Sequence, residues 1–336
     1  MTIISRRALL SWGALSAGAA LTAGLPTIAA AKSRSARKLK AVERSAHGTT
    51  LRMRLAHAPF PDVDAPYRDS TVYIHVPTGF SANPDGTLDM LVHFHGLNSR
   101  ASDPLRKHRV REQLASSRKN ALLILPQGPD RANDTAGGKL DKVYGLKNLL
   151  TEVALVLQDE EVQARAERFI APPDASPGRV ILSAHSGGFQ VLAHSLARGR
   201  IPVQEVYLFD ALYGFTGIFA NWLAQTRHEP RPAQHRLFSY YNPEGKLTEE
   251  WTETLMRQLK ARGIAYRAAE FAGHLQPEEL ERDRVVFMQT HAPHDLVPVH
   301  GEALHYCLKT SCFSTIAPPQ RRNTPQAQVG PLSTRP

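Results

Sequence analysis

Seven short apolar runs, separated by stretches with helical periodicity, limit this chain to a small set of folds. The runs cover residues 71–76, 90–95, 121–125, 180–182, 206–209, 237–240 and 285–288. Runs this short and uniformly apolar are typical of strands buried on both faces of a parallel sheet. Helical patterns fall between them, at about residues 104–119, 141–157, 189–198 and 249–261. The alternation predicts an α/β fold, with a mostly parallel sheet and helices on both faces.

The fourth run leads directly into the segment Ala184-His185-Ser186-Gly187-Gly188. A strand thus delivers Ser186 into a tight turn, and small neighbours leave room for the chain to enter the next helix. This layout resembles the nucleophile elbow of the α/β-hydrolase superfamily, with Ala184 in place of the usual first glycine. The resemblance covers about residues 70–310. It implies an α/β-hydrolase fold with Ser186 as the nucleophile of a serine hydrolase, whereas the alternative is a glycine-rich turn around an ordinary serine.

The same resemblance points to a second motif upstream. Acyl transfer at a serine needs N–H donors where negative charge builds on the substrate oxygen. By resemblance, one donor is the backbone N–H of Gly187. The run at 90–95 continues into Gly96-Leu97-Asn98, which places the second donor at Leu97 or Asn98. Leu97 and Gly187 are therefore the predicted oxyanion hole.

A serine hydroxyl becomes nucleophilic when an imidazole accepts its proton and a carboxylate orients that imidazole. In the superfamily the order along the chain is serine, acid, histidine. Asp210 ends the run at 206–209 and is the predicted acid. Glu244 follows the next apolar run and is the alternative acid.

Two histidines compete for the role of general base. His294 lies in a loop directly after the run at 285–288, and His274 follows a weaker strand-like segment at 264–271. His274 stands in a Gly-His pair of the kind common in the superfamily. The more uniformly apolar run before His294 favours His294, and His274 remains the alternative.

His93 and His95 support a different hypothesis. Alternate residues on a strand point to the same side, so two imidazoles could share a metal ion in a metal-dependent hydrolase. Such a site needs a third ligand, and no His-x-x-x-Asp-His string follows the pair. A further alternative is a non-catalytic envelope-binding protein on a hydrolase fold. We favour a serine hydrolase that cleaves an ester, with an amide as the second choice, and that needs no metal or organic cofactor.

The basic charge of the chain is concentrated at its two ends. The formal net charge is +10, of which residues 1–31 carry +2, residues 32–54 carry +7 and residues 317–336 carry +3. The body, residues 55–316, is left with −2. A near-neutral body argues against nucleic-acid binding. We expect the basic ends to contact an anionic envelope surface.

Residues 1–31 have the pattern of an export signal. Arg6 and Arg7 precede an apolar stretch that ends in small residues, as secretory signals do. The paired arginines, followed by Leu9 and Leu10, resemble the twin-arginine class, which carries folded proteins across the bacterial inner membrane. We therefore expect the export machinery as a partner, and a periplasmic or secreted protein. The expected divisions are a signal at 1–31, a flexible basic leader at 32–54, a catalytic domain at 55–316 and a disordered tail at 317–336.

Two further features each allow two interpretations. Cys307 and Cys312 either form a disulfide, which an oxidising compartment permits, or remain free thiols. The basic run at 106–111 either binds an anionic substrate near the pocket or forms a solvated helix face.

Overall fold

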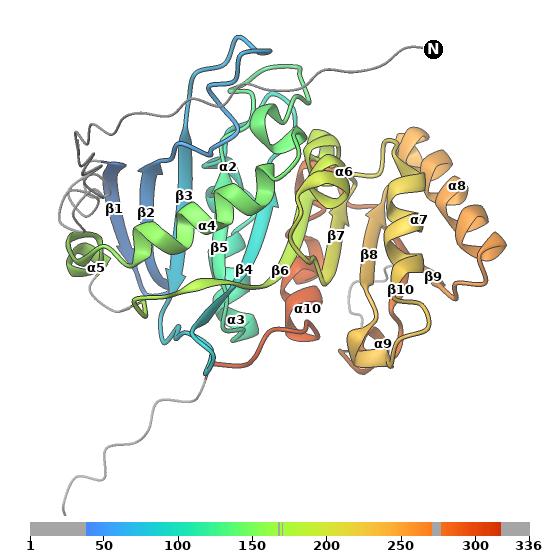
Figure 1. Ribbon diagram of the computed structural model, residues 1–336. Helices are drawn as coiled ribbons and strands as arrows, with labels where there is room; N and C mark the ends of the chain where they lie inside the picture. Colours follow the sequence, from blue (N-terminus) through green and yellow to red (C-terminus); the bar gives the residue numbers. More distant parts are fainter. Residues whose placement is uncertain (1–37, 167–168, 170, 271–276, 317–336) are drawn as a thin grey trace, which may run out of the picture.

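The structure, a computed structural model, describes residues 38–166, 169, 171–270 and 277–316 (Figure 1). Its strands form one sheet in the order β1-β2-β3-β5-β4-β6-β7-β8-β10-β9. Their bounds are β1 Leu39–Ser45, β2 Gly48–Arg54, β3 Thr71–Pro77, β4 Thr87–Phe94, β5 Leu122–Pro126, β6 Ser176–His185, β7 Glu205–Phe209, β8 Arg236–Tyr241, β9 Arg267–Glu270 and β10 Val285–Gln289. Pairing is antiparallel from β1 to β5 and parallel from β5 to β9. The mostly parallel sheet predicted from the sequence is confirmed.

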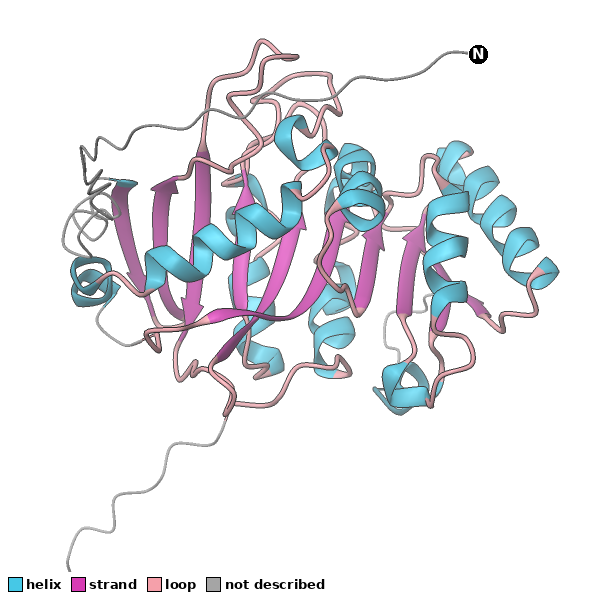
Figure 2. Ribbon diagram, in the orientation of Figure 1, coloured by secondary structure: helices cyan, strands magenta, loops and turns pink. Residues whose placement is uncertain are grey.

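Helices cover both faces of this sheet (Figure 2). The helices are α2 Asp103–Arg106, α3 Val110–Ser117, α4 Gly145–Leu157, α5 Glu160–Ala166, α6 Phe189–Arg198, α7 Thr216–Gln225, α8 Leu247–Ala261, α9 Pro277–Arg282 and α10 Ala303–Lys309. α4, α6, α7 and α8 share one apolar core with the sheet, and α2, α3, α9 and α10 share the other. None of the helices described combines the length and the apolar character needed to cross a bilayer.

Strand β5 shows how its sequence builds both cores. Leu122 and Ile124 belong to one core, and Leu123 and Leu125 belong to the other. Successive side chains of a strand point to opposite faces, so a strand buried on both faces must be apolar at every position. The short apolar runs of the sequence are therefore the central strands of the sheet. With helices on both faces and β6 leading through a tight turn into α6, the chain has an α/β-hydrolase fold.

Residues 39–54 correct the expectation of a flexible leader. They form β1 and β2, and β2 pairs along its whole length with β3. Leu51 and Met53 are fully buried, whereas Arg52 and Arg54 are exposed. This alternation is the period of a strand with one solvated face, and the basic exposed positions concealed it. The folded domain thus includes β1, while the expected signal at 1–31 and tail at 317–336 lie outside the described residues.

The two cysteines are free thiols in this structure. Cys307 is buried, its Sγ atom lies 3.7 Å from the Tyr240 hydroxyl, and burial raises the pKa of this thiol to about 12. The backbone N–H of Cys312 donates to the Glu205 carboxylate at 2.7 Å. The disulfide that the sequence allows is therefore not formed.

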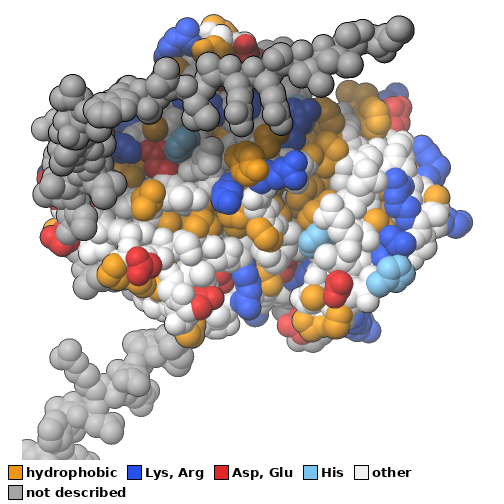
Figure 3. Space-filling view, viewed as in Figure 1, with side chains coloured by type: hydrophobic (Ala, Val, Ile, Leu, Met, Phe, Trp, Pro, Cys, Tyr) orange, Lys and Arg blue, Asp and Glu red, His pale blue; other side chains and the backbone are white. Residues whose placement is uncertain are grey.

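Charged side chains of both signs are dispersed over the visible surface. On the face shown in Figure 3, basic and acidic side chains are interspersed with hydrophobic and uncharged ones.

The basic run at 106–111 includes two arginines that form ion pairs. Arg106 pairs with Asp103 at 2.6 Å and Arg111 with Glu43 at 2.7 Å. These pairs neutralise part of the charge that an anionic substrate would require.

Candidate active site

The parallel strands end at one edge of the sheet, and three of those ends carry the residues predicted to form a triad. Ser186 follows β6, Asp210 follows β7, and His294 lies in the loop after β10. The His294 Nε2 atom lies 2.8 Å from Ser186 Oγ, and His294 Nδ1 lies 2.6 Å from Asp210 Oδ2. The structure thus brings these three residues into one hydrogen-bonded chain, although 108 and 84 residues separate the bonded pairs.

Ser186 occupies a strained turn between β6 and α6. Its φ is 51°, in the left-handed region that serine rarely adopts, and such a conformation costs about 1–3 kcal/mol. Glycines make room around it, because a Cβ atom on Gly96 would lie 2.8 Å from Ser186 Cβ. A Cβ atom on Gly188 would lie 2.8 Å from the Phe94 carbonyl oxygen. The turn therefore depends on small residues at Gly96 and Gly188. It exposes the Ser186 hydroxyl at the edge of the sheet.

Asp210 is 2% exposed and is held as a carboxylate. Burial alone would raise the pKa of Asp210. The hydrogen bond from His294, the Thr248 side chain and the Asn242 N–H, which donates to Oδ1 at 3.3 Å, together lower this pKa below its ordinary value. The carboxylate therefore stays ionised and can stabilise a positive charge on His294.

His294 is more exposed to solvent than Asp210, with 40% of its side chain accessible. The hydrogen bond to Asp210 raises the pKa of His294 above its ordinary value, while burial opposes this shift. A higher pKa makes the imidazole a stronger base toward the Ser186 hydroxyl. As the pH falls through this raised pKa, the His294 ring becomes protonated and can no longer accept the Ser186 proton.

The two alternative triad residues take no part in this hydrogen-bonded chain. Glu244 lies in a short 3-10 helix, Pro243–Gly245, where its side chain is exposed and its N–H donates to the Asn242 side chain. Asp210, which follows the strand next to β6, is the carboxylate bonded to His294. His274 lies outside the described residues.

The amides of Leu97 and Gly187 lie beside each other next to Ser186. A Cβ atom on Gly187 would lie 3.1 Å from Leu97 N and 2.5 Å from Leu97 Cγ. The Asn98 N–H donates to the Ala132 carbonyl at 2.9 Å, so it is committed elsewhere. Within the described part of the chain, the Leu97 N–H has no hydrogen-bond partner. Leu97 rather than Asn98 is therefore the geometrically suitable second donor.

His93 and His95 do not form the shared metal site that their spacing allows. His95 donates from Nδ1 to the Gly96 carbonyl at 2.9 Å, and its Nε2 accepts the Gly128 N–H at 2.9 Å. His93 Nδ1 is hydrogen-bonded to the Ser183 hydroxyl at 2.9 Å. Since a metal ligand needs a free nitrogen lone pair, His95 cannot serve as one in this arrangement. The His95 ring thus joins two loops, whereas the His93 ring links β4 to β6.

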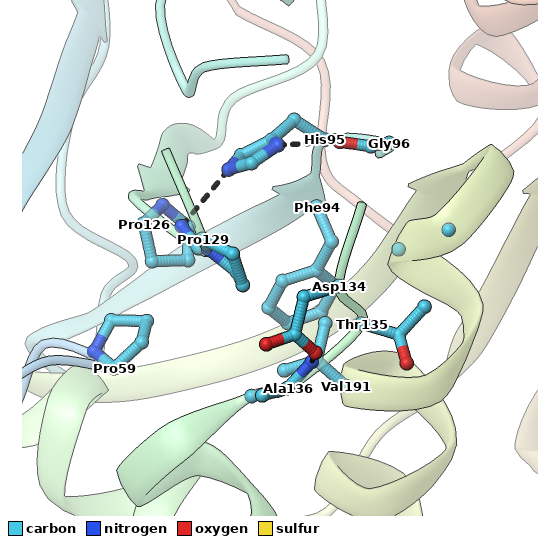
Figure 4. Close-up of a pocket in the computed structure, with 14 residues that line it drawn as sticks. Pro59, Phe94, His95, Gly96, Pro126, Pro129, Asp134, Thr135, Ala136 and Val191 are labelled. Carbon is cyan, nitrogen blue, oxygen red and sulfur yellow. Dashed lines mark hydrogen bonds between the residues drawn. The ribbon is translucent and has the colours of Figure 1, made fainter. Parts of the chain in front are cut away.

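A narrow pocket opens beside residues 96–98, the predicted oxyanion loop (Figure 4). Its lining includes Gly96 and Gly187 together with apolar side chains from Pro59, Pro126, Pro129, Phe94 and Val191. Asp134 is the only charged residue in the lining, within the described part of the chain. Its carboxylate accepts hydrogen bonds from the Tyr67 hydroxyl at 2.7 Å and the Ala136 N–H at 2.9 Å. The pocket therefore presents an apolar wall and one negative charge next to Gly187.

Asn242 and Thr248 support Asp210, and neither was predicted from the sequence. Both follow β8, two and eight residues after the last position of the apolar run at 237–240. An asparagine directly after a buried strand is a weak signal, because such residues commonly begin turns. Their contribution becomes visible only when β8 is placed beside β7.

Comparisons with known proteins give distant structural similarities. No family model matches the chain, and no curated protein matches it. Similar solved structures include an S-formylglutathione hydrolase from Agrobacterium tumefaciens, 10% identical with a TM-score of 0.43, covering 81% of this chain and 95% of that one. A ferulic acid esterase is 13% identical with a TM-score of 0.41, covering 71% and 90%. A fluorophosphonate-binding serine hydrolase of Staphylococcus aureus is 11% identical with a TM-score of 0.42, covering 77% and 95%.

Gly187→Ala tests the two-amide arrangement. The added methyl would crowd Leu97 N and Cγ, so we expect Leu97 to shift and kcat to fall about 10²- to 10³-fold, as when an oxyanion donor is lost. Gly217→Ala is the matched control, because nothing lies within 4 Å of its added methyl. The measurements are ester turnover and thermal unfolding of both variants. Equal activity of the two would contradict the assignment of Leu97 and Gly187.

Proposed function

We propose that this protein hydrolyses esters through an acyl-enzyme intermediate on Ser186. The observation that supports this most directly is the hydrogen-bonded chain from the Ser186 hydroxyl through His294 to the buried Asp210 carboxylate. The adjacent Leu97 and Gly187 amides supply the electrostatic stabilisation that such a reaction needs. Esters are favoured over amides because an alkoxide leaves more readily than an amide nitrogen. Amides are the second substrate class.

The reaction proceeds in two halves. Ser186 Oγ attacks the ester carbonyl carbon while its proton passes to His294 Nε2, and the carbonyl oxygen becomes an oxyanion held by the two amides. Asp210 stabilises the imidazolium that forms. His294 then gives its proton to the departing alcohol, and the acyl group remains on Ser186. In the second half, water loses a proton to His294, attacks the acyl-enzyme and releases the acid with regeneration of Ser186.

Labelling with a fluorophosphonate probe tests the nucleophile. We expect stoichiometric labelling of the wild type and none of Ser186→Ala, with turnover of 4-nitrophenyl acetate reduced by at least about 10³-fold. Ser183→Ala, in β6 three residues before Ser186 and buried against His93, is the matched control and should still be labelled. Equal labelling of Ser186→Ala and wild type would contradict the proposal. Loss of activity on adding a chelator, with no labelling of the wild type, would favour the metal-dependent alternative instead.

The pocket beside the oxyanion loop favours neutral acyl groups. Its apolar wall lowers the free energy of a bound alkyl chain, and the Asp134 carboxylate repels an anionic one. At partial exposure this repulsion is worth about 1 kcal/mol, or about fivefold in rate. We infer that the physiological substrate is a neutral ester rather than one whose acyl group carries a carboxylate.

Asp134→Asn tests this charge discrimination. The substitution should raise kcat/KM for a 4-nitrophenyl ester with a terminal acyl carboxylate about fivefold relative to the neutral ester of the same length. Asp130→Asn is the control, because Asp130 is paired with Arg100 at 2.6 Å and lies outside the pocket lining. An unchanged ratio in Asp134→Asn would exclude the pocket as the acyl site.

We also propose that the protein is exported by the twin-arginine route. Arg6, Arg7 and the apolar stretch after them support this proposal. The double change Arg6→Lys with Arg7→Lys should retain the protein in the cytoplasm of a bacterial host, as cell fractionation would measure. Arg34→Lys, beyond the signal, should leave export unchanged. Normal export of the double variant would contradict this route.

A further inference from the structure

The loop that carries His294 is anchored by buried side chains from three other elements. Carbonyl oxygens of Ala292, His294 and Pro298 accept hydrogen bonds from Asn242 Nδ2 at 3.1 Å, His185 Nε2 at 2.9 Å and Gln113 Nε2 at 3.0 Å, respectively. We call these three donors the loop clamp. They are 8%, 5% and 4% exposed. These three bonds tie the backbone of the loop to buried side chains, so the position of this loop is strongly determined.

His185 is the clamp residue that acts on the catalytic histidine itself. It precedes Ser186 in the chain, and its ring lies 4.8 Å from the His294 ring. The elbow therefore holds His294 twice, once at its Nε2 atom through Ser186 and once at its carbonyl oxygen through His185. Two bonds to the same residue restrict both the ring and the backbone that carries it.

The environment of His185 keeps its ring a neutral N–H donor. Burial, followed by the influence of the adjacent His108 ring, lowers the pKa of His185 to about 3. Because a carbonyl can only accept, the proton of the neutral ring must be on Nε2. The neutral His185 ring then adds no positive charge beside His294 at the pH where His294 must accept a proton.

Gln113 supports both ends of this arrangement. Its Nε2 atom donates to the His108 carbonyl at 2.7 Å as well as to Pro298. The His108 ring packs edge-on against His185, with centroids 4.8 Å apart and an interplanar angle of 71°. His108 belongs to the basic run at 106–111. That run thus contributes a packing support for the catalytic loop through its one histidine.

We infer that His185 is a positioning residue, which fixes the distance between His294 and Ser186 by donating to the His294 carbonyl. The inference rests on the proposed function, since it concerns the same base and nucleophile. This hydrogen bond can affect the rate strongly, because a displacement of about 1 Å in a catalytic group can lower the rate about 10²-fold. The contact involves no substrate atom, so His185 affects catalysis through His294.

The decisive comparison is His185→Leu against His185→Gln. Leucine removes the donor, whereas the glutamine side-chain amide can replace the Nε2–H group. We expect His185→Leu to lower kcat for 4-nitrophenyl acetate about 10- to 100-fold with KM little changed, and to slow fluorophosphonate labelling in parallel. His185→Gln should recover most of both rates. Equal impairment of the two variants, with native unfolding transitions, would overturn the inference.

His235→Leu is the matched control. His235 also donates from its ring to a backbone carbonyl, that of Trp222 at 2.8 Å, but on the α7 side of the fold. Its loss should affect the unfolding temperature and leave kcat unchanged. If His185→Leu fails to fold, Gln113→Met loosens the same loop at Pro298 and should lower kcat in the same way. A kcat for Gln113→Met equal to that of the wild type would then overturn the inference.

The pH profile separates a positioning effect from general loss of stability. In the wild type, kcat/KM should fall at low pH with a midpoint above about 6.5, because Asp210 raises the pKa of His294. In His185→Leu the Asp210 contact loosens and raises that pKa less, so the midpoint should move to lower pH. An unmoved midpoint together with wild-type kcat would overturn the inference. Failure of Ser186 labelling in the wild type would instead reject the proposed function itself.

Discussion

A parallel sheet buried on both faces leaves only the ends of its strands free for chemistry. In this protein the ends of β6, β7 and β10 are followed by the hydroxyl, the carboxylate and the imidazole, respectively. β10, however, is separated from β6 by β7 and β8. The loop after β10 must therefore cross two strand ends before His294 can reach Ser186. The placement of this loop is the condition on which the whole site depends.

The structure meets that condition with buried hydrogen bonds, together with the burial of Ala292 and Val297 in one of the two apolar cores. Asn242 contributes in two ways, because its N–H donates to Asp210 and its side-chain amide donates to Ala292. Buried polar groups must be satisfied, so these donors and the loop carbonyls hold each other in one geometry. The hydrogen bonds around the site also stabilise the strained backbone at Ser186 and Asp210, with φ of 51° and 44°. The rigid strands β6 and β7, which precede these two residues, allow their backbone few other conformations.

The sequence predicted the central strands, the elbow and the carboxylate at the end of β7, because each follows from local pattern and chain order. It did not predict β1 and β2, since β1 is mostly exposed and arginines on the exposed face of β2 disguised its alternation of buried residues. It favoured His294 over His274 through the more uniformly apolar run at 285–288, but left His274 as an alternative. That choice depends on which strand lies next to β8, and strand order is a long-range property. No local pattern in the sequence assigned a role to His185.

By itself, then, the sequence determined what the chain can build and which chemistry it can carry. Short apolar runs require a doubly covered sheet, and a serine in a glycine-rich strand-to-helix turn requires an exposed hydroxyl. The tertiary structure decided which imidazole meets that hydroxyl and which amide faces it. It also decided what holds the imidazole in place. These are contacts between residues about 80 to 190 positions apart, which only the sheet order and the packing of loops across the strand ends can specify.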